Sequence, residues 1–224
     1  MTLVKIAFVL DCTASMEEWI YAAQTKIREI VETSKRDHPL AQFEVGLVAY
    51  RDYGDIARFH TMDFTTPEEV MESLQDIHAE GGDDEAEDVA HALRQVMELD
   101  WMDADLRMVF HITDAPAHGY MFHRPHVSDR FPEGDPEGLD PRTIISQMSL
   151  RGFFYSFVKI TSATDTMLDM FHNSWIGEGR FRILDLRPQV FGRSRGVDMS
   201  DMLSPIVSRV VSQAIDQHTF SQDM

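Results

Sequence analysis

The chain has 224 residues, of which 43% are hydrophobic and 26% charged, a composition typical of a globular protein with a sizeable core. Asp and Glu together number 38 against 20 Lys and Arg, and the formal net charge of −18 argues against nucleic acid and anionic membranes as partners. The single cysteine excludes an internal disulfide framework. We find no signal peptide and no apolar run that could cross a bilayer, so we expect a cytoplasmic protein.

The first part of the chain alternates predicted strands and helices. Residues 4–10 are almost wholly apolar, which predicts a strand buried on both faces of a parallel sheet. Apolar residues at helical spacing predict a helix over 16–35, and a second strand is expected over 43–50. Residues 57–64 have the pattern of a short edge strand. A capping box that begins at Thr66 then predicts the start of another helix.

The second part continues the alternation around one long irregular stretch. A helix is predicted over about 86–97 and a third buried strand over 106–112, which ends at Thr113-Asp114. Residues 115–140 are rich in Pro, Gly, His and Asp and form a long loop in this prediction. The remaining predicted elements are a helix over 140–150, a strand over 153–160, a helix over 162–174, a strand over 181–186 and a helix over 199–217.

This alternation of strands and helices predicts the fold class. Right-handed crossovers between successive strands give an α/β fold with an open, mostly parallel, doubly wound sheet and helices on both faces. No internal repeat or linker divides the sequence, so we expect a single domain over 1–224 with a loop insertion at about 115–140.

Three polar segments are expected at the carboxyl ends of the strands, where such sheets bind ligands. The first is Asp11-Cys12-Thr13-Ala14-Ser15, the second is the acidic run 81–88, and the third is Thr113-Asp114. Hydroxyl and carboxylate oxygens are the ligands that Mg²⁺ prefers, and the glycines of the second segment permit a close approach. Together the segments predict a site for a hard divalent cation.

Ser15 also has a purely structural interpretation. A serine that follows a strand is often the N-cap of the next helix, and Ser15 would suit the predicted helix over 16–35. The two roles can coexist. Cys12 alternates with Asp11 and Thr13, so we expect its side chain to point the other way and to be buried and inert.

These segments resemble the metal-ion-dependent adhesion site of the von Willebrand factor type A (vWA) domain. The first segment fits the family pattern Asp-x-Ser/Thr-x-Ser, and the apolar strand that ends in Thr113-Asp114 fits the third loop of the family. The second segment departs from the adhesion-receptor pattern and resembles the variant Gly-Gly-x-Asp-x-x-Glu. Here it offers Asp83 and Asp84, and we favour Asp84 as the ligand. The resemblance implies a Rossmann-like vWA fold and a Mg²⁺, Mn²⁺ or Ca²⁺ ion held by Asp11, Thr13, Ser15, Asp84 and Asp114.

The resemblance also has implications for function. Residues 113–119 and 134–139 are most similar to vWA domains found beside alpha-kinases, although no kinase region is recognisable in this chain. The family implies a protein-binding module without enzymatic activity, in which an Asp or Glu of a partner protein completes the coordination of the ion. It further implies that the helix over 199–217 shifts when a partner binds.

The long loop supports rival interpretations. His118, His123 and His126 lie close enough in sequence for a zinc site, with His111 on the strand before them. Metal sites built from one irregular loop are uncommon, so we expect solvated histidines or a loop packed over the cation site. A metal-dependent hydrolase with a loop histidine as general base is the main functional alternative. A structural scaffold with degenerate metal loops is a third.

Overall fold

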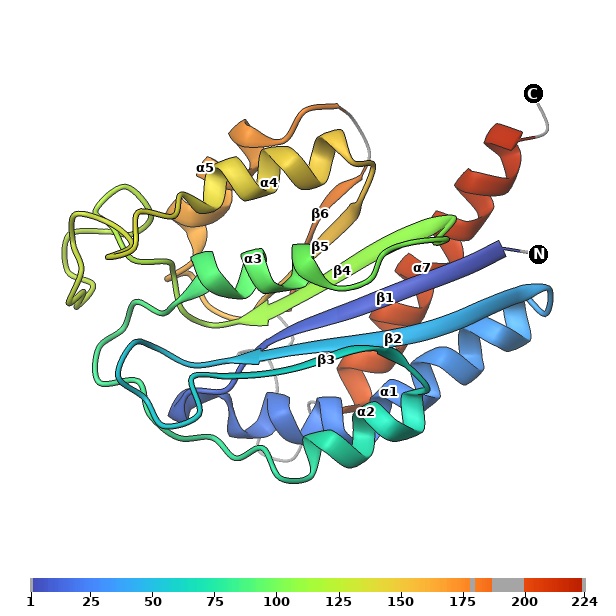
Figure 1. Cartoon of the computed structure of the whole chain (residues 1–224), viewed down its shortest axis with the longest axis horizontal. Coiled ribbons are helices and arrows are strands. Elements are labelled where there is room, and N and C mark those ends of the chain that lie inside the picture. The colour runs from blue at the N-terminus through green and yellow to red at the C-terminus, as the bar shows by residue number, and fades with distance from the viewer. Residues whose placement is uncertain (1, 178–179, 187–199, 223–224) are drawn as a thin grey trace.

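The computed structural model describes residues 2–177, 180–186 and 200–222 (Figure 1). Six strands form one sheet in the order β3-β2-β1-β4-β5-β6. The strands are β1 (Thr2–Asp11), β2 (Ala41–Tyr50), β3 (Phe59–Thr65), β4 (Leu106–Thr113), β5 (Phe154–Lys159) and β6 (Phe181–Asp185). The helices are the short 3₁₀ helix η1 (Ala14–Met16), α1 (Glu17–Asp37), α2 (Pro67–Leu74), α3 (Val89–Glu98), α4 (Pro141–Leu150), α5 (Asp165–Ser174) and α7 (Ser200–Gln222).

The sheet is mostly parallel, which confirms the predicted fold class. The five strands β2, β1, β4, β5 and β6 run parallel to one another, and the edge strand β3 pairs antiparallel with β2. Helices α1, α2 and α7 cover one face of the sheet, and α3, α4 and α5 cover the other (Figure 1). None of the described helices is long and apolar enough to span a membrane.

The two faces of β1 explain why its sequence is apolar at every position from Ile6 to Leu10. Ile6, Phe8 and Leu10 belong to the core beneath α1 and α7, whereas Ala7 and Val9 belong to the core beneath α3 and α4. A strand at the centre of a doubly covered sheet must bury both sets of side chains. This burial fixes the register of β1 and therefore the position of the residues that follow it.

Side-chain caps set the helix starts that matter for the site. Helix α2 begins with the predicted capping box of Thr66 and Glu69. Helix α3 begins at Val89 and not at Ala86, because the Asp88 side chain accepts a hydrogen bond from the backbone nitrogen of His91 and so caps the helix. The residues just before Asp88 consequently belong to a loop.

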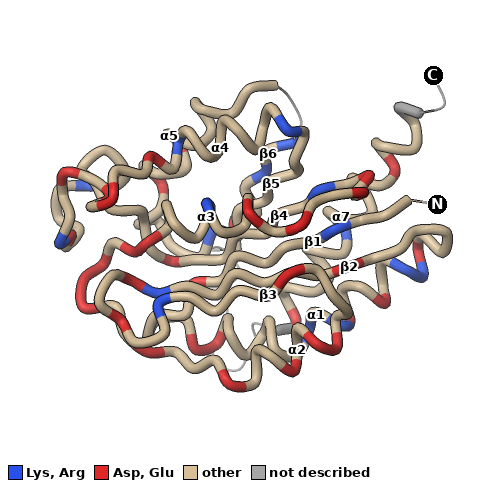
Figure 2. Tube along the Cα trace, in the orientation of Figure 1, with Lys and Arg blue, Asp and Glu red and all other residues tan. Residues whose placement is uncertain are grey.

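Three loops gather at the carboxyl ends of β1 and β4, which are neighbours in the sheet. They are residues 51–58, the acidic loop (residues 81–88) and the long loop (residues 115–140). The long loop contains no helix or strand, but it packs against the acidic loop through a bridge between Glu87 and Ala117 and through the carbonyl oxygen of Ser128, which accepts from the nitrogens of Glu85 and Ala86. Figure 2 shows how acidic residues concentrate along these loops.

Candidate metal centre

Asp11 is fully buried at the end of β1, and both of its carboxylate oxygens are held in place. Oδ1 accepts hydrogen bonds from the backbone nitrogen of Thr13 at 2.9 Å and from its hydroxyl at 2.7 Å. Oδ2 accepts a hydrogen bond of 2.8 Å from the Thr113 hydroxyl at the end of β4. The ends of the two central strands therefore meet at one oriented carboxylate.

Ser15 and Asp114 lie beside this carboxylate and contact each other. The Ser15 hydroxyl donates to Asp114 Oδ1 at 3.0 Å. The predicted capping role of Ser15 is wrong, because Ser15 lies inside η1 and the N-cap of α1 is Met16, without a side-chain hydrogen bond. Its hydroxyl is directed toward the third loop, which leaves it available to the site.

Asp84 faces the same cavity from the acidic loop. This cavity of about 520 Å³ is lined by Thr13, Ser15, Asp84, Glu87 and Asp114, with Gly81 and Gly82 and the small residues Ala14, Ala115, Thr161, Ser162 and Ala163 among the others. Asp84 Oδ2 accepts a 2.7 Å hydrogen bond from the backbone nitrogen of Arg130, and Asp84 Oδ1 is buried. The Asp83 side chain, in contrast, is 82% exposed and lies 3.5 Å from the Arg130 guanidinium. Thr13, Ser15, Asp84 and Asp114 thus line one cavity, and Asp11 is linked to it through its hydrogen bonds with Thr13.

Glu87 was not among the predicted ligands, yet it lies in the same cavity. It is 2% exposed, and its Oε2 is buried with no hydrogen-bond partner in the described part of the chain. A Cβ atom built on Gly82 would lie 3.1 Å from Glu87 Oε1 and 3.2 Å from Thr13 Cβ, so the absence of a side chain at Gly82 brings the acidic loop against the first one. The sequence signal was the Glu of the Gly-Gly-x-Asp-x-x-Glu pattern.

Burial together with mutual repulsion shifts the pKa values of these acids. Burial and the charge of Asp114 raise the pKa of Asp11 to about 6. Burial raises the pKa of Asp114, and burial with the charges of Asp11 and Asp52 raises the pKa of Glu87 to about 10. Carboxylates and hydroxyls gather here beside a buried oxygen that has no hydrogen-bond partner among the described residues, and this oxygen-rich donor set fits a hard divalent cation.

The expectation of solvated histidines holds for His126 but is wrong for His118 and His123, which are buried where the long loop packs against its neighbours. His118 and His123 are both hydrogen-bonded to Asp129. His126 is exposed, and His111 lies in the core between the hydroxyls of Tyr50 and Tyr155. The four histidines therefore do not form one cluster.

Cys12 is buried, as predicted, with 1% exposure. Its thiol lies 3.4 Å from the carbonyl oxygen of Leu10, and burial raises the pKa of the thiol above its ordinary value. A high thiol pKa disfavours the nucleophilic thiolate. The position of Cys12 between two site residues thus has a structural cause and no evident chemical role.

Sequence comparisons identify relatives of known name. The family model described as von Willebrand factor A domain matches residues 5–125. Alpha-protein kinase vwkA of Dictyostelium discoideum is 31% identical over 172 residues, which cover 75% of this chain and 27% of that protein. Human von Willebrand factor A domain-containing protein 7 is 39% identical over 90 residues, which cover 40% of this chain and 10% of that protein. The chain thus spans about a quarter or less of the length of these relatives.

Solved structures with the same fold include distant proteins. A pilus adhesin, SpaC from Lactobacillus rhamnosus GG, superposes with a TM-score of 0.63 at 13% identity, over 97% of this chain and 30% of that one. The SpRpn10 VWA domain superposes with a TM-score of 0.55 at 12% identity, over 88% of this chain and 98% of that one. At these identities the likeness concerns the fold alone.

Proposed function

Because this chain belongs to the von Willebrand factor A domain family, we propose that it is a protein-interaction module whose bound Mg²⁺ ion is completed by a carboxylate of the partner. Domains of this family mediate protein–protein contacts and often bind a divalent metal. The proposal assigns the ion to Asp11, Thr13, Ser15, Asp84 and Asp114, and adds Glu87. We further propose a binding function without catalysis, in the cytoplasm.

One observation carries this proposal. Residues from four segments far apart in sequence, within 13–15, 81–87, 114–115 and 161–163, line one cavity, and the buried Oε2 of Glu87 in that cavity has no hydrogen-bond partner in the described part of the chain. An unsatisfied buried carboxylate oxygen costs free energy unless a positive charge compensates it. When bound, the ion supplies that charge and an electrophilic position for a further oxygen ligand.

The charge of the chain explains why an acidic partner should bind only when the ion is present. With a net charge of −18 and several acids at the cavity, the protein alone repels a carboxylate. Ala14, Ala115 and Ala163 line the cavity with small side chains, which leave room for an Asp or Glu side chain. We propose neither nucleic acid nor a membrane as partner.

The hydrolase alternative receives no support from the position of the histidines. In the described part of the chain, no histidine lines the cavity that contains Ser15 and Asp114. Both ring nitrogens of His118 are hydrogen-bonded to carboxylates, Nε2 to Asp52 and Nδ1 to Asp129. A general base needs a free nitrogen within reach of the attacking water.

Thermal unfolding in EDTA and in graded Mg²⁺ tests the metal site. The unfolding midpoint of the parent should rise with Mg²⁺, by the equivalent of about 2.7 kcal/mol at a hundredfold excess over the Kd. Asp11→Ala should abolish this rise while the chain remains folded. Asp76→Ala, which removes an exposed acid elsewhere, should keep it. Equal responses of the parent and Asp11→Ala would contradict the assignment.

The partner chemistry needs a separate measurement. We would immobilise pairs of peptides that differ at one position, where one member has Asp or Glu and the other has Asn or Gln. Retention should require both an acidic residue in the peptide and Mg²⁺ in the buffer, and Asp11→Ala should lose it. Retention that persists in EDTA would contradict a metal-bridged contact while leaving a protein-interaction role in place.

A further inference from the structure

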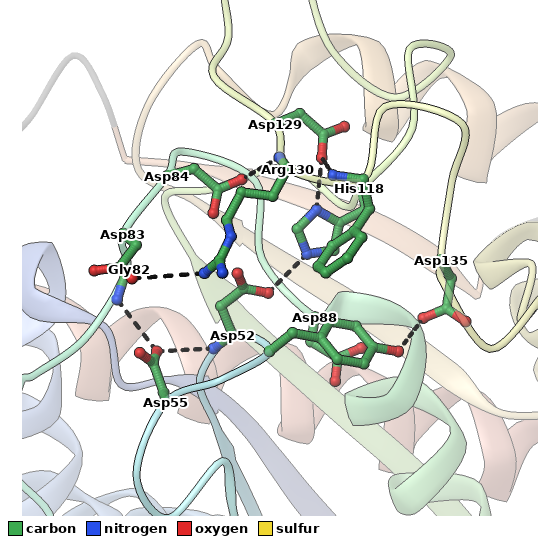
Figure 3. A network of polar contacts seen from close by, with 12 residues as sticks. Asp52, Asp55, Gly82, Asp83, Asp84, Asp88, His118, Asp129, Arg130 and Asp135 are labelled. Carbon is green, nitrogen blue, oxygen red and sulfur yellow. Dashed lines mark hydrogen bonds and ion pairs between the residues drawn. The ribbon is translucent and has the colours of Figure 1, made fainter.

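A second buried polar cluster lies between the loop that follows β2, the acidic loop and the long loop. Its members are Asp52, Asp84, His118 and Asp129 (Figure 3). His118 is at the centre of the cluster, with the carboxylates of Asp52 and Asp129 on opposite sides of its ring. The loop over 51–58 contributes Asp52, the acidic loop Asp84, and the long loop His118 and Asp129.

The geometry of the cluster is tight. His118 Nε2 lies 2.7 Å from Asp52 Oδ1, and Nδ1 lies 2.8 Å from Asp129 Oδ1. One potential ligand atom each from Asp84, His118 and Asp129 can be chosen so that all three lie within 4.8 Å of one another. The side chains of Asp52, His118 and Asp129 are each 2% exposed. Asp84, His118 and Asp129 therefore surround one point, whereas Asp52 lies across the His118 ring from Asp129.

Two oxygens of the cluster are unsatisfied. Asp52 Oδ2 and Asp84 Oδ1 are buried, and neither has a hydrogen-bond partner in the described part of the chain. Asp52 as a whole is 1% exposed. Burial raises the pKa of Asp84, and the nearby charge of Asp52 adds to the shift. Buried carboxylate oxygens that have no donor in the described part of the chain require a proton or a cation.

A neighbouring cluster provides an internal comparison. Asp88, His91 and Asp135 also bring three ligand atoms within 4.8 Å of one another. There, however, Asp88 Oδ1 accepts from His91, and Asp88 Oδ2 pairs with Arg58, while Asp135 accepts from the Tyr53 hydroxyl. Because its acids are compensated by protein groups, we assign no ion to that cluster.

We propose that Asp84, His118 and Asp129 form a second divalent-cation site, selective for a transition metal such as Zn²⁺ over Mg²⁺, and that Asp52 holds the His118 ring from its opposite nitrogen. One imidazole with several carboxylates is a donor set that Zn²⁺ accepts readily, whereas Mg²⁺ prefers oxygen alone. The bound cation replaces a proton of His118, and the opposite ring nitrogen keeps its hydrogen bond to a carboxylate, which orients the ring. The role of the site is to lock the long loop onto the two loops beside the first site.

This site differs from the zinc site considered from sequence alone. His126 is exposed and remote from the hydrogen bonds of the cluster, and His123 contacts Asp129 without being one of the three clustered ligands. Asp84 of the acidic loop and Asp129 of the long loop take the places that His123 and His126 would have taken. The inference does not depend on the proposed function, although the two sites adjoin at Asp84.

Isothermal titration with Zn²⁺ after chelator treatment tests the proposal, in buffer that contains excess Mg²⁺ to occupy the first site. The parent should bind one tight equivalent of Zn²⁺. His118→Gln should lose this equivalent, and Asp52→Asn should weaken it by about 10- to 100-fold. The matched variant His126→Gln, which removes an exposed histidine of the same loop, should bind as the parent does. Circular dichroism and the thermal unfolding midpoint in EDTA check that each variant folds.

The variants separate this proposal from the first one. Asp11→Asn should lose the Mg²⁺ response but keep the Zn²⁺ equivalent, and His118→Gln should show the opposite pattern. Zn²⁺ should also slow tryptic cleavage at the exposed Arg130 in the parent and not in His118→Gln. No tight Zn²⁺ equivalent in the parent, or an unchanged one in His118→Gln, would overturn the second site and leave the first untouched.

Discussion

The hydroxyl of Thr113 at the end of β4 donates a 2.8 Å hydrogen bond to Asp11 Oδ2 at the end of β1. The other oxygen of Asp11 is occupied by Thr13, so the carboxylate is oriented from both sides. Thr113 also accepts from the backbone nitrogen of Ala115 and thereby fixes the start of the long loop. This arrangement assigns Thr113 a positioning role in the candidate metal site, without direct contact with the ion.

Thr113→Val should weaken Mg²⁺ binding while the fold is retained. Valine has nearly the volume of threonine but cannot donate to Asp11, and the loss of a partner that orients a ligand typically costs about 10- to 100-fold in metal affinity. Mg²⁺ titration followed by the unfolding midpoint measures the effect. Thr219→Val, at an exposed position of α7, is the matched control. An unchanged Mg²⁺ affinity in Thr113→Val would show that Asp11 needs no such orientation.

Glu87→Gln should stabilise the chain in EDTA and abolish or sharply weaken its response to Mg²⁺. The pKa of Glu87, about 10 in the folded chain, lies above its ordinary value of 4.5, so the folded state holds a proton that the unfolded state releases. The stability of the parent without divalent ions therefore falls as pH rises from 4.5 toward 10. Glutamine cannot ionise, and at pH 8 we expect the variant to gain about 1 kcal/mol or more.

Urea unfolding of Glu87→Gln at pH 8, with and without Mg²⁺, measures both the gain in unfolding free energy and the response to the ion. Asp83→Asn removes one negative charge from the same loop at an exposed position and serves as the control. A destabilised Glu87→Gln that still responds to Mg²⁺ as the parent does would mean that Glu87 has only a structural role.

Much of the fold and part of the site were predictable, because both depend on local patterns. Apolar runs located β1 and β4, and the residues that end such strands had to meet at one edge of a parallel sheet. Asp11 and Asp114 were therefore expected at the carboxyl ends of two strands, and the structure has them there. The resemblance to vWA domains associated with alpha-kinases, drawn from the same loops, is confirmed by the family match and by the Dictyostelium relative.

The features that escaped prediction depend on contacts between distant loops. The helical spacing of apolar residues predicted that the helix begins at about Ala86, which places Glu87 inside the helix. In the structure Asp88 caps α3, so Glu87 belongs to the acidic loop, and this cap cannot be read from the spacing. The partners of His118 are Asp52 and Asp129, and only the folded path of the long loop brings Asp52 within reach. Residues 187–199, which precede α7, lie outside the described residues, and the predicted shift of that helix on binding stays a prediction.

Asp84→Asn should weaken Mg²⁺ binding more than Asp83→Asn does. Asp84 lines the cavity, whereas the side chain of Asp83 is 82% exposed beside Arg130. Loss of a charged ligand should reduce the affinity by about tenfold or more, which corresponds to about 1.4 kcal/mol. Parallel titrations of the two variants decide between the adjacent acids. A larger loss in Asp83→Asn would mean that the acidic loop rearranges around the ion.

Mg²⁺ binding should release protons near neutral pH. Burial and the neighbouring acids raise the pKa of Glu87 to about 10 and that of Asp11 to about 6, so Glu87 is protonated at pH 7 and Asp11 becomes protonated as the pH falls below 6. Metal ligands must be deprotonated, so the affinity should fall as pH falls, by about tenfold per unit for each proton released. Calorimetry in two buffers of different ionisation enthalpy counts these protons. Affinity that does not change with pH would exclude Glu87 as a ligand.

His111 should make the chain less stable in acid for a reason unrelated to metal. It lies between the hydroxyls of Tyr50 and Tyr155, and burial lowers its pKa from 6.5 to about 3. Below pH 6.5 the unfolded chain binds a proton at this position and the folded chain does not, so stability falls as pH decreases toward 3.

His111→Gln removes this titration but keeps an amide that can hydrogen-bond to both tyrosines. We expect the free energy of unfolding of the variant to depend less steeply on pH between 6 and 4, by up to about 1.4 kcal/mol per pH unit. Urea unfolding across this range in EDTA measures the difference, and His126→Gln, at an exposed position, should keep the steepness of the parent. Equal slopes for the parent and His111→Gln would mean that His111 is protonated in the folded chain, which its two hydroxyl partners could accommodate only if both accepted a hydrogen bond from the ring.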